Sequence, residues 1–259
     1  MTDRIFHIGI DLHGTLINNN EFLSEGSENA LKEILKAKPN DIKLYICTGN
    51  DLLFVKRKLG DITYLFDGAV LETGCVVSTD MQTEEIIVPK NIVDQIKILE
   101  NTLLDCDYPE VYKFARRLST ISMFTRYEYP LEDFHQKIKK ELKYLDYARV
   151  TRSSVAVDII PAKHDKYNGL EYFGKGKDVF VAVADSLNDI EWLKKADISF
   201  MPNNADLSTI EQLAIIKTKK PLSYNLDKKS LYVSDKSETF GVIEILKNIF
   251  DNYKSFDLK

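Results

Sequence analysis

The stretch HIGIDLHGTLIN, residues 7–18, places an aspartate at the end of an apolar run. Asp11 closes that run, and Gly14 and Thr15 follow within four residues. A carboxylate in this position can attack phosphorus or hold a cation, and a turn after it exposes backbone N–H groups to an anion. An aspartate after a strand is often only a turn residue or a helix cap. The stretch therefore needs partners elsewhere in the chain to predict phosphoryl chemistry.

A pair of acids ends another apolar run. In VFVAVADSLNDIEWL, Asp185 follows the run 179–184 and Asp189 comes four residues later. With a turn leading into a helix, both carboxylates can face one cation, with Asn188 as a supporting neighbour. Hard oxygen ligands in small number suit magnesium. Paired acids are common on exposed helices, but a buried strand has little other use for an acid at its end.

Two further segments could hold the oxygens of a phosphate group. Thr48 and Gly49 end the run LYICTGN, where a hydroxyl and free N–H groups at a helix start can bind an anion. Thr48 could instead cap the helix that begins near Asp51. In IIPAKHDKYNGL, Lys166 precedes a helix and could neutralise a phosphoryl oxygen and the attacking carboxylate. Lys163 competes with it for this role.

These residues need a scaffold that brings the ends of strands together. Apolar runs alternate with helical patterns in the first third of the chain and again after residue 179. We expect strands at 5–10, 43–47, 64–71, 179–184 and 198–201, and helices at 27–38, 51–59, 190–195, 207–215 and 240–253. This alternation predicts an α/β fold with a parallel sheet covered on both faces. Ligands bind outside the carboxyl ends of such strands.

The pattern changes in the middle of the chain. Strands at 76–78, 85–88, 118–125 and 148–160, with helices at 91–104 and 131–145, predict an α+β module inserted into the α/β domain. The chain leaves the core near Gly74 and returns near Pro161. We therefore place the core at residues 1–75 and 162–259 and the inserted module at 76–161.

The composition narrows the class of protein. The 259 residues are 44% hydrophobic and 29% charged, as in an ordinary globular enzyme, and the net charge of -5 argues against nucleic-acid binding. No stretch approaches the roughly 20 apolar residues that span a bilayer, and no signal peptide precedes the first strand. The cysteines Cys47, Cys75 and Cys106 are widely spaced, which suits a reducing cytoplasm and predicts neither disulfides nor zinc. Cys47 is expected to pack in the core.

In their order along the chain, these residues resemble the motifs of the haloacid dehalogenase superfamily of phosphotransferases. The matching residues are Asp11 and Thr15 in DLHGTL, Thr48 in CTGN, Lys166, and Asp185 and Asp189 in ADSLND. The later segments MPNNA, residues 201–205, and GVIEIL, residues 241–246, are similar to the closing segments of the family. The resemblance implies a Rossmann-like core with a mobile cap that closes over the site.

The place of the insertion, between the second and third motifs, is that of one subgroup of this family. The subgroup includes sugar-phosphate phosphatases, phosphoglycolate phosphatase and the eukaryotic type of phosphomannomutase. The segments FARRLSTISMFTR and VAVDIIPAKHDKY are similar to substrate-binding parts of the mutase. By that likeness the residues that could face substrate are Arg116, Arg117, Arg126 and Asp158. Solvent exposure or packing is the alternative for each of them.

The resemblance also implies a mechanism and a cofactor. Asp11 attacks phosphorus and forms an aspartyl-phosphate, which water then hydrolyses. Thr48, Gly49 and Lys166 hold the remaining phosphoryl oxygens. The implied ligands of Mg²⁺ are Asp11, the backbone carbonyl of His13, Asp185 and Asp189. The implied substrate is a small phosphorylated metabolite, such as a sugar phosphate.

Three core positions depart from the family pattern. Ala184 stands where glycine is usual, Asn50 where arginine is common, and His13 where the family has the aspartate that acts as general acid and base. Imidazole can protonate a leaving oxygen and deprotonate water, because its unperturbed pKa of about 6.5 lies near working pH. We therefore expect His13 to act as the acid and base, with a site that has lost this function as the alternative.

Two other functions are compatible with the same core. A phosphosugar mutase would return the phosphoryl group to sugar and would need a bisphosphate activator. A non-catalytic phosphosugar-binding protein would keep its affinity for Mg²⁺ and ligand without turnover. His13 favours the binding protein, whereas the intact Asp11 argues against it, because a binder needs no attacking group.

Overall fold

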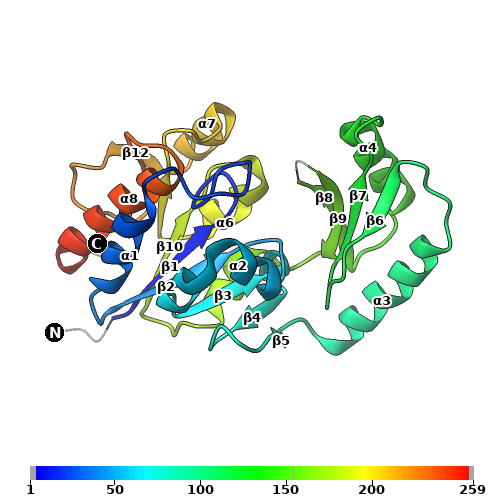
Figure 1. The fold of residues 1–259 in the computed structure, drawn as a ribbon, viewed down its shortest axis with the longest axis horizontal. Coiled ribbons are helices and arrows are strands. Elements are labelled where there is room, and N and C mark those ends of the chain that lie inside the picture. The colour runs from blue at the N-terminus through cyan, green and yellow to red at the C-terminus, as the bar shows by residue number, and fades with distance from the viewer. Residues whose placement is uncertain (1–3, 154, 257–259) are drawn as a thin grey trace.

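A computed structural model describes residues 4–153 and 155–256 of the chain. Two sheets organise these residues into two lobes (Figure 1): a nine-stranded sheet in the core and a four-stranded sheet in the inserted part. The result is an α/β core that carries a second, α+β lobe, as the sequence pattern predicts.

The large sheet is mostly parallel. Its strands are β1 (Phe6–Asp11), β2 (Ile42–Cys47), β3 (Gly68–Leu71), β4 (Val76–Ser78), β5 (Glu85–Ile86), β10 (Val179–Val183), β11 (Ile198–Met201), β12 (Thr218–Pro221) and β13 (Ser230–Val233). They lie in the order β12-β13-β11-β10-β1-β2-β3-β4-β5, and only the pairs β3–β4 and β4–β5 are antiparallel. The helices of the core are α1 (Glu28–Lys36), α2 (Leu52–Leu59), α5 (Lys166–Glu171), α6 (Ile190–Lys195), α7 (Leu207–Ala214) and α8 (Glu238–Asn252).

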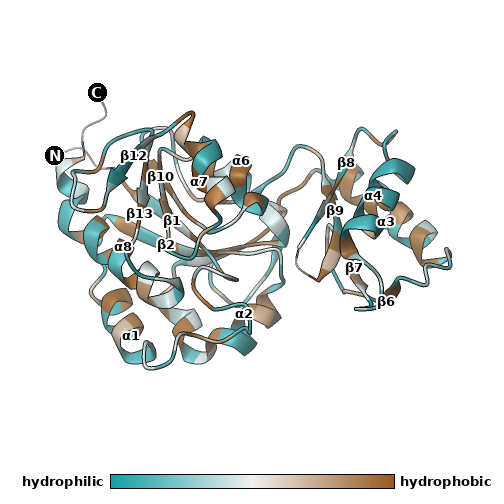
Figure 2. Ribbon diagram, turned by 90° about the horizontal axis from the view of Figure 1, so that it is seen from above, coloured by the Kyte–Doolittle hydropathy of each residue, from teal (hydrophilic) through white to brown (hydrophobic). Residues whose placement is uncertain are grey.

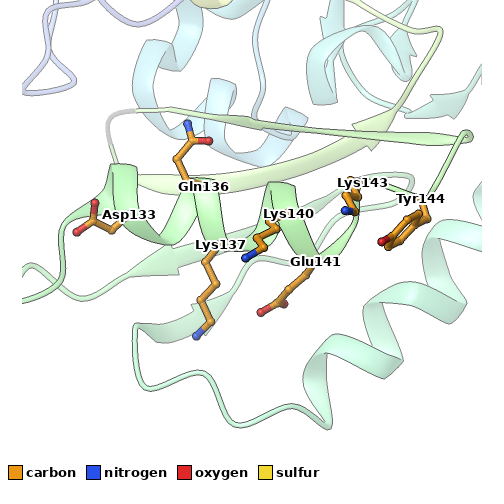
Figure 3. A pocket seen from close by; sticks show the side chains of 7 residues that line it. All are labelled: Asp133, Gln136, Lys137, Lys140, Glu141, Lys143 and Tyr144. Carbon is orange, nitrogen blue, oxygen red and sulfur yellow. The ribbon is translucent and has the colours of Figure 1, made fainter.

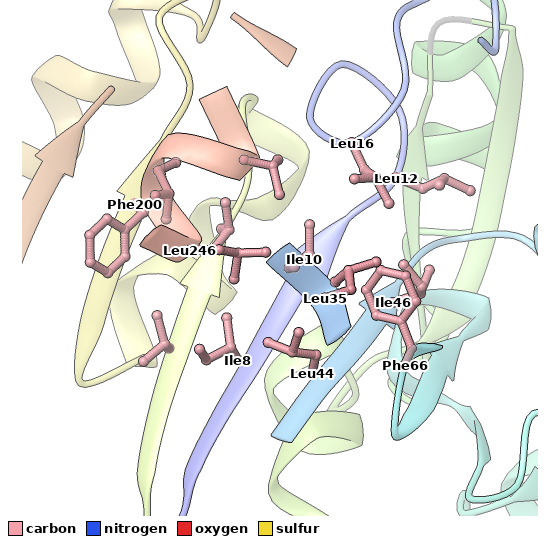
Figure 4. Packing of buried hydrophobic residues seen from close by; sticks show 14 of the residues in the cluster. Ile8, Ile10, Leu12, Leu16, Leu35, Leu44, Ile46, Phe66, Phe200 and Leu246 are labelled. Atoms are coloured by element: carbon pink, nitrogen blue, oxygen red, sulfur yellow. The ribbon is translucent and has the colours of Figure 1, made fainter. Parts of the chain in front are cut away.

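Helices cover both faces of this sheet. Successive side chains of β1 point to opposite faces, and their contacts show which helices cover which face. Ile8 and Ile10 point into a cluster with side chains of α1, α2 and α8 (Figure 4). Gly9 points to the other face, where an added Cβ would lie 2.6 Å from the ring of Trp192 in α6. A second cluster on that face joins α5, α6 and α7. Burial on both faces explains the continuously apolar runs of the central strands.

The topology brings the predicted site residues to one edge. β1 lies between β2 and β10, and both neighbours run parallel to it. Asp11 pairs with Cys47 in β2, and Ile10 pairs with Val183 in β10. The loops that follow β1, β2 and β10 therefore leave the sheet at the same edge, on the two sides of a topological switch point.

Of the expected module 76–161, residues 90–161 form the separate lobe; this lobe is called the inserted module from here on, and it has a core of its own. Its strands are β6 (Val111–Phe114), β7 (Ile121–Thr125), β8 (Ala148–Arg152) and β9 (Ala156–Pro161), in the antiparallel order β6-β7-β9-β8. Helices α3 (Lys90–Leu104) and α4 (Leu131–Glu141) pack on one face through residues such as Ile96, Phe134 and Val157. These helices lie on the side away from the core (Figure 1 and Figure 2), so the other sheet face is turned toward it.

Several expected elements differ from those observed. The hairpin β4–β5, expected in the inserted module, extends the core sheet, because the turn after β3 folds the chain back onto that strand. The expected strand 148–160 is a hairpin, closed where the N–H of Ser153 donates to Ala156 O at 2.9 Å. The first part of the expected strand 64–71 belongs to a 3-10 helix, Gly60–Leu65. Strand β6 was not expected. Cys47 and Cys75 are buried and Cys106 is exposed, and all three are free.

Candidate active site

Three carboxylates meet at the carboxyl ends of β1 and β10. Asp11 is the last residue of β1, Asp185 follows β10, and Asp189 ends the 3-10 turn before α6. One oxygen of each lies within 4.8 Å of the others, an arrangement that could hold a metal ion. Asp11 and Asp189 are buried and Asp185 is half-buried. Residues separated by more than 170 positions in the chain thus form one cluster.

Lys166 lies inside this cluster. Its Nζ donates to Asp11 Oδ1 at 2.5 Å and lies 2.6 Å from Asp189 Oδ1. Burial alone would lower the pKa of Lys166, but the two carboxylates outweigh it and raise that pKa, so the ammonium stays charged. The side chain of Asp165 caps α5 and fixes Lys166 in its first turn. Lys163 is exposed, so the structure favours Lys166 over Lys163 as the site lysine.

The cluster carries an excess of negative charge. Among the described residues only Lys166 forms ion pairs with these carboxylates. Burial, together with the nearby charges of Asp11 and Asp189, raises the pKa of Asp185 to about 7. Burial also raises the pKa of Asp189 to about 6, although Lys166 opposes the shift. A small set of hard, mutually repelling oxygens fits a divalent cation such as Mg²⁺.

These raised pKa values predict how stability depends on pH when metal is absent. An unfolded aspartate has a pKa of about 3.9, so the folded state binds more protons over the window up to about pH 7. The free energy of unfolding should therefore fall as the pH rises through this window. Asp185→Asn lacks this titration. In chelator, the free energy of unfolding of the variant minus that of wild type should therefore increase from about pH 5 to about pH 8. Urea titrations measure the free energy of unfolding of each protein. A difference between the two that stays constant with pH would contradict the raised pKa of Asp185.

The loop after β1 is fixed against Asp185. The hydroxyl of Thr15 donates to Asp185 Oδ1 at 3.1 Å. Gly14 has φ of +73°, and a Cβ there would lie 2.3 Å from Asp185 Oδ2, so only glycine fits. Asn204, in the MPNNA segment, donates from Nδ2 to the carbonyl of Gly14 at 2.7 Å. The role of Asn204 was not expected, although its segment was noted.

Thr48 and Gly49 begin the turn 48–51 at the end of β2. Thr48 is buried, and its N–H donates to Val70 O at 2.8 Å. Its hydroxyl accepts a hydrogen bond from the N–H of Asn50 at 3.2 Å, which leaves the hydroxyl hydrogen to donate. The cap of α2 is Asp51, which accepts from the N–H of Phe54 at 2.8 Å. Thr48 is therefore not the helix cap, and the alternative role for it is excluded.

His13 lies in the loop that follows β1, beside α2. Its Nε2 is 3.7 Å from Glu21 Oε1, and its ring centroid is 5.3 Å from that of Phe54. Burial lowers the pKa of His13, although Glu21 opposes the shift. The imidazole is therefore neutral at neutral pH and can accept a proton.

The residues expected to face substrate divide into two groups. Arg117 is buried, with Nη2 donating to Asn50 Oδ1 at 3.1 Å and Nη1 3.6 Å from Asp51 Oδ2. Asp158 accepts from the hydroxyl of Ser122 at 2.5 Å on the module face opposite α3 and α4. In contrast, Arg116 and Arg126 are exposed, and their side chains form no hydrogen bond or ion pair with the residues that the structure describes.

Asn188 was expected to support the metal ligands. Its side chain is exposed and forms no hydrogen bond to the carboxylates in the described part of the chain. An open hollow of about 660 Å³ lies on the surface of α4 (Figure 3), lined by residues between Asp133 and Tyr144. None of the predicted site residues lines it, and no function is assigned to it.

A known protein family matches most of the chain. The model of the haloacid dehalogenase-like hydrolase family matches residues 8–108 and 107–220. No curated protein matches the chain. No helix among the described residues is long and apolar enough to cross a membrane.

Solved structures resemble the whole chain. SMU.1108c of Streptococcus mutans has a TM-score of 0.67 at 18% identity, covering 96% of this chain and 100% of the other. Protein 0175 of Thermoplasma acidophilum has a TM-score of 0.66 at 16% identity, covering 94% and 97%. BT1666 of Bacteroides thetaiotaomicron, described among phosphatases of the haloalkanoate superfamily, has a TM-score of 0.64 at 17% identity, covering 95% of each chain. At such identities the likeness shows the fold alone.

Proposed function

The chain belongs to the family of haloacid dehalogenase-like hydrolases, and on that premise we propose that it is a Mg²⁺-dependent phosphatase of a small phosphorylated metabolite, such as a sugar phosphate. The observation that carries the proposal is the position of Asp11. Its carboxylate ends β1, contacts the charged Lys166 at 2.5 Å and lies among two further carboxylates. This combination of nucleophile, fixed cation and acidic cluster suits phosphoryl transfer and has no evident packing role.

The proposed reaction has two steps on Asp11. Its oxygen forms a bond to phosphorus as the bond to the leaving oxygen breaks, and water then attacks the aspartyl-phosphate to release phosphate. Lys166 lies against Asp11 and can neutralise a phosphoryl oxygen. The hydroxyl of Thr48 and the N–H of Gly49 are the proposed donors to the other oxygens.

The acidic cluster is proposed to hold Mg²⁺. The residues that would hold it are Asp11, the carbonyl oxygen of His13, Asp185 and Asp189. When bound, the ion would neutralise charge on the transferring phosphoryl group. The Thr15 hydroxyl holds Asp185 for this task, and Gly14 leaves room for its carboxylate.

His13 is the proposed acid and base. If the protonated fraction of His13 donates its proton to the leaving oxygen and the neutral ring then takes a proton from water, His13→Ala should lower kcat by at least about tenfold, because a positioned acid/base contributes about 10² to 10⁴ in rate. The pH–rate profile should also lose an ionisation, at a pH below the usual histidine value because burial lowers the pKa of His13. Equal kcat in His13→Ala and wild type, or a gain of orders of magnitude in His13→Asp, would show that His13 is a bystander.

A panel of phosphate monoesters, sugar phosphates among them, tests the proposal as a whole. Free phosphate is measured with Mg²⁺ present, against Asp11→Asn as the matched blank. We expect release from at least one member of the panel by wild type alone. Interconversion of hexose phosphates that requires a bisphosphate and releases no phosphate would favour a mutase instead. Binding of Mg²⁺ and phosphate without any turnover would favour a binding protein.

A further inference from the structure

Glu72 is a buried carboxylate outside the acidic cluster, directly after β3. It is 1% exposed. Its Oε1 accepts from the N–H of Leu118 at 2.6 Å, and its Oε2 accepts from the N–H of Ser119 at 2.9 Å. The hydroxyls of Ser119 and Thr120 also donate to Oε2, each at 3.0 Å. A buried carboxylate is costly unless donors satisfy it, and here the donors come from one short segment of the inserted module.

The backbone of Glu72 contacts the turn 48–51. The N–H of Glu72 donates to Asn50 O at 3.2 Å, and the N–H of Thr73 donates to Thr48 O at 3.1 Å. Glu72 and Thr73 have φ of 45° and 56°, in the left-handed region that side chains disfavour. Gly74 follows at φ of 93°, where a Cβ would lie 1.8 Å from Asp165 O. Such strain persists only where the surrounding contacts impose it, and it concentrates at functional sites.

The segment 117–120 of the inserted module reaches into the core. Arg117 is 9% exposed and contacts Asn50 and Asp51 in the turn 48–51. Leu118 packs against the core cluster on the α1, α2 and α8 face. Glu72 therefore touches the turn 48–51 through its backbone and the segment 117–120 through its carboxylate. The same segment places Arg117 against the turn 48–51.

We propose that Glu72 is a positioning residue that fixes the inserted module, and Arg117 with it, against the phosphate-binding turn. This inference rests on the proposed function only where turnover is the readout. Glu72 itself is assigned no contact with substrate. Its loss should reduce the fraction of molecules in which the module is seated, and the apparent affinity for substrate falls by that fraction.

Glu72→Gln is the sharpest probe of this role. The N–H groups of Leu118 and Ser119 address different oxygens of the carboxylate. A glutamine has one acceptor oxygen, so whichever way its amide turns, one of these N–H groups faces an NH₂. The substitution keeps the shape and size of the side chain but removes one of the two backbone hydrogen bonds that join Glu72 to the inserted module.

Glu244→Gln serves as the matched control. Glu244 lies in α8, and one of its oxygens accepts from the N–H of Asp235 at 3.0 Å and from the hydroxyl of Ser234. Like Glu72, it accepts from a backbone N–H and a hydroxyl, but it does so within the core, away from the inserted module. A milder pair, Ser119→Ala with Thr120→Val, removes only the hydroxyl donors to Glu72 and decides the question if Glu72→Gln does not fold.

Two measurements on the full chain test the inference. Hydrogen exchange at the N–H of Thr73 needs no substrate, and its acceptor, Thr48 O, is untouched by the substitution. We expect exchange at least about tenfold faster in Glu72→Gln, unchanged exchange in Glu244→Gln, and an intermediate rate in the hydroxyl pair. With substrate, KM should rise by about tenfold or more while kcat stays within about threefold of wild type.

A lower melting temperature with wild-type exchange at Thr73 and wild-type KM would show that Glu72 is only structural, and would overturn the inference. If wild type hydrolyses no phosphate monoester, the proposed function fails, and the exchange rates alone then decide the role of Glu72. Faster exchange at Thr73 would still support that role, and unchanged exchange would reject it.

Discussion

Asp11→Asn is expected to abolish phosphatase activity while the protein stays folded. The amide cannot attack phosphorus as a carboxylate does, and the cluster loses one of the two carboxylates that pair with Lys166. Loss of a covalent nucleophile typically lowers kcat by about 10⁴ to 10⁶. The measurement is kcat on the best substrate of the panel, with the melting temperature and circular dichroism as checks of folding.

Asp178→Asn is the matched control for this result. Asp178 precedes β10 at the opposite edge of the same sheet, where it accepts from the N–H groups of Ile5 and Lys175 at 3.2 and 2.8 Å. Its substitution can cost stability but should leave kcat within about threefold of wild type, because it lies away from the reacting atoms. Activity of Asp11→Asn within about tenfold of wild type would remove Asp11 from the mechanism.

Removal of divalent cation is expected to have the second-largest effect. With three carboxylate oxygens within 4.8 Å of one another and one lysine between them, the site repels an anionic substrate until a cation binds. After dialysis against chelator, turnover should fall by at least about a hundredfold, since the charge stabilisation from a metal is worth several kcal/mol. Added Mg²⁺ should restore it.

Calcium provides the control for this experiment. Ca²⁺ takes more ligands at longer distances than Mg²⁺, so it should bind the acidic cluster yet restore little activity. The activity is measured over a titration of each ion at fixed substrate. Full activity in excess chelator would contradict the assignment of Asp185 and Asp189 as metal ligands.

The sequence predicted the central part of the fold well, for a physical reason. Strands of a parallel sheet are buried on both faces, so β1, β2 and β10 appear as continuous apolar runs that end abruptly in polar residues. Asp11, Thr48 and Asp185 stand at those ends, and the parallel register then brings them to one edge. The order of the motifs along the chain was therefore enough to predict that Asp11, Asp185, Asp189 and Lys166 lie together.

Other features have no local signal in the sequence. The contact of Glu72 with Leu118 joins residues 46 positions apart across two lobes, and no periodicity marks either of them. The hairpin β4–β5 pairs with β3 because of the left-handed turn at residues 72–74, which the sequence shows only as a single glycine. Asn188 precedes Asp189 directly in sequence, but its side chain is exposed and forms no hydrogen bond to the carboxylates in the described part of the chain.

The most direct test of the account is a search for a phosphoryl group on Asp11 during turnover. Wild-type protein with Mg²⁺ and a radiolabelled substrate from the panel is quenched in acid within one turnover, and its peptides are separated. The account predicts an acid-stable, hydroxylamine-labile label on the peptide that contains Asp11, absent in chelator and in Asp11→Asn. Phosphate release with the label on another residue would contradict the account. So would release with no labelled protein, even in His13→Ala, where attack by water is expected to be slow.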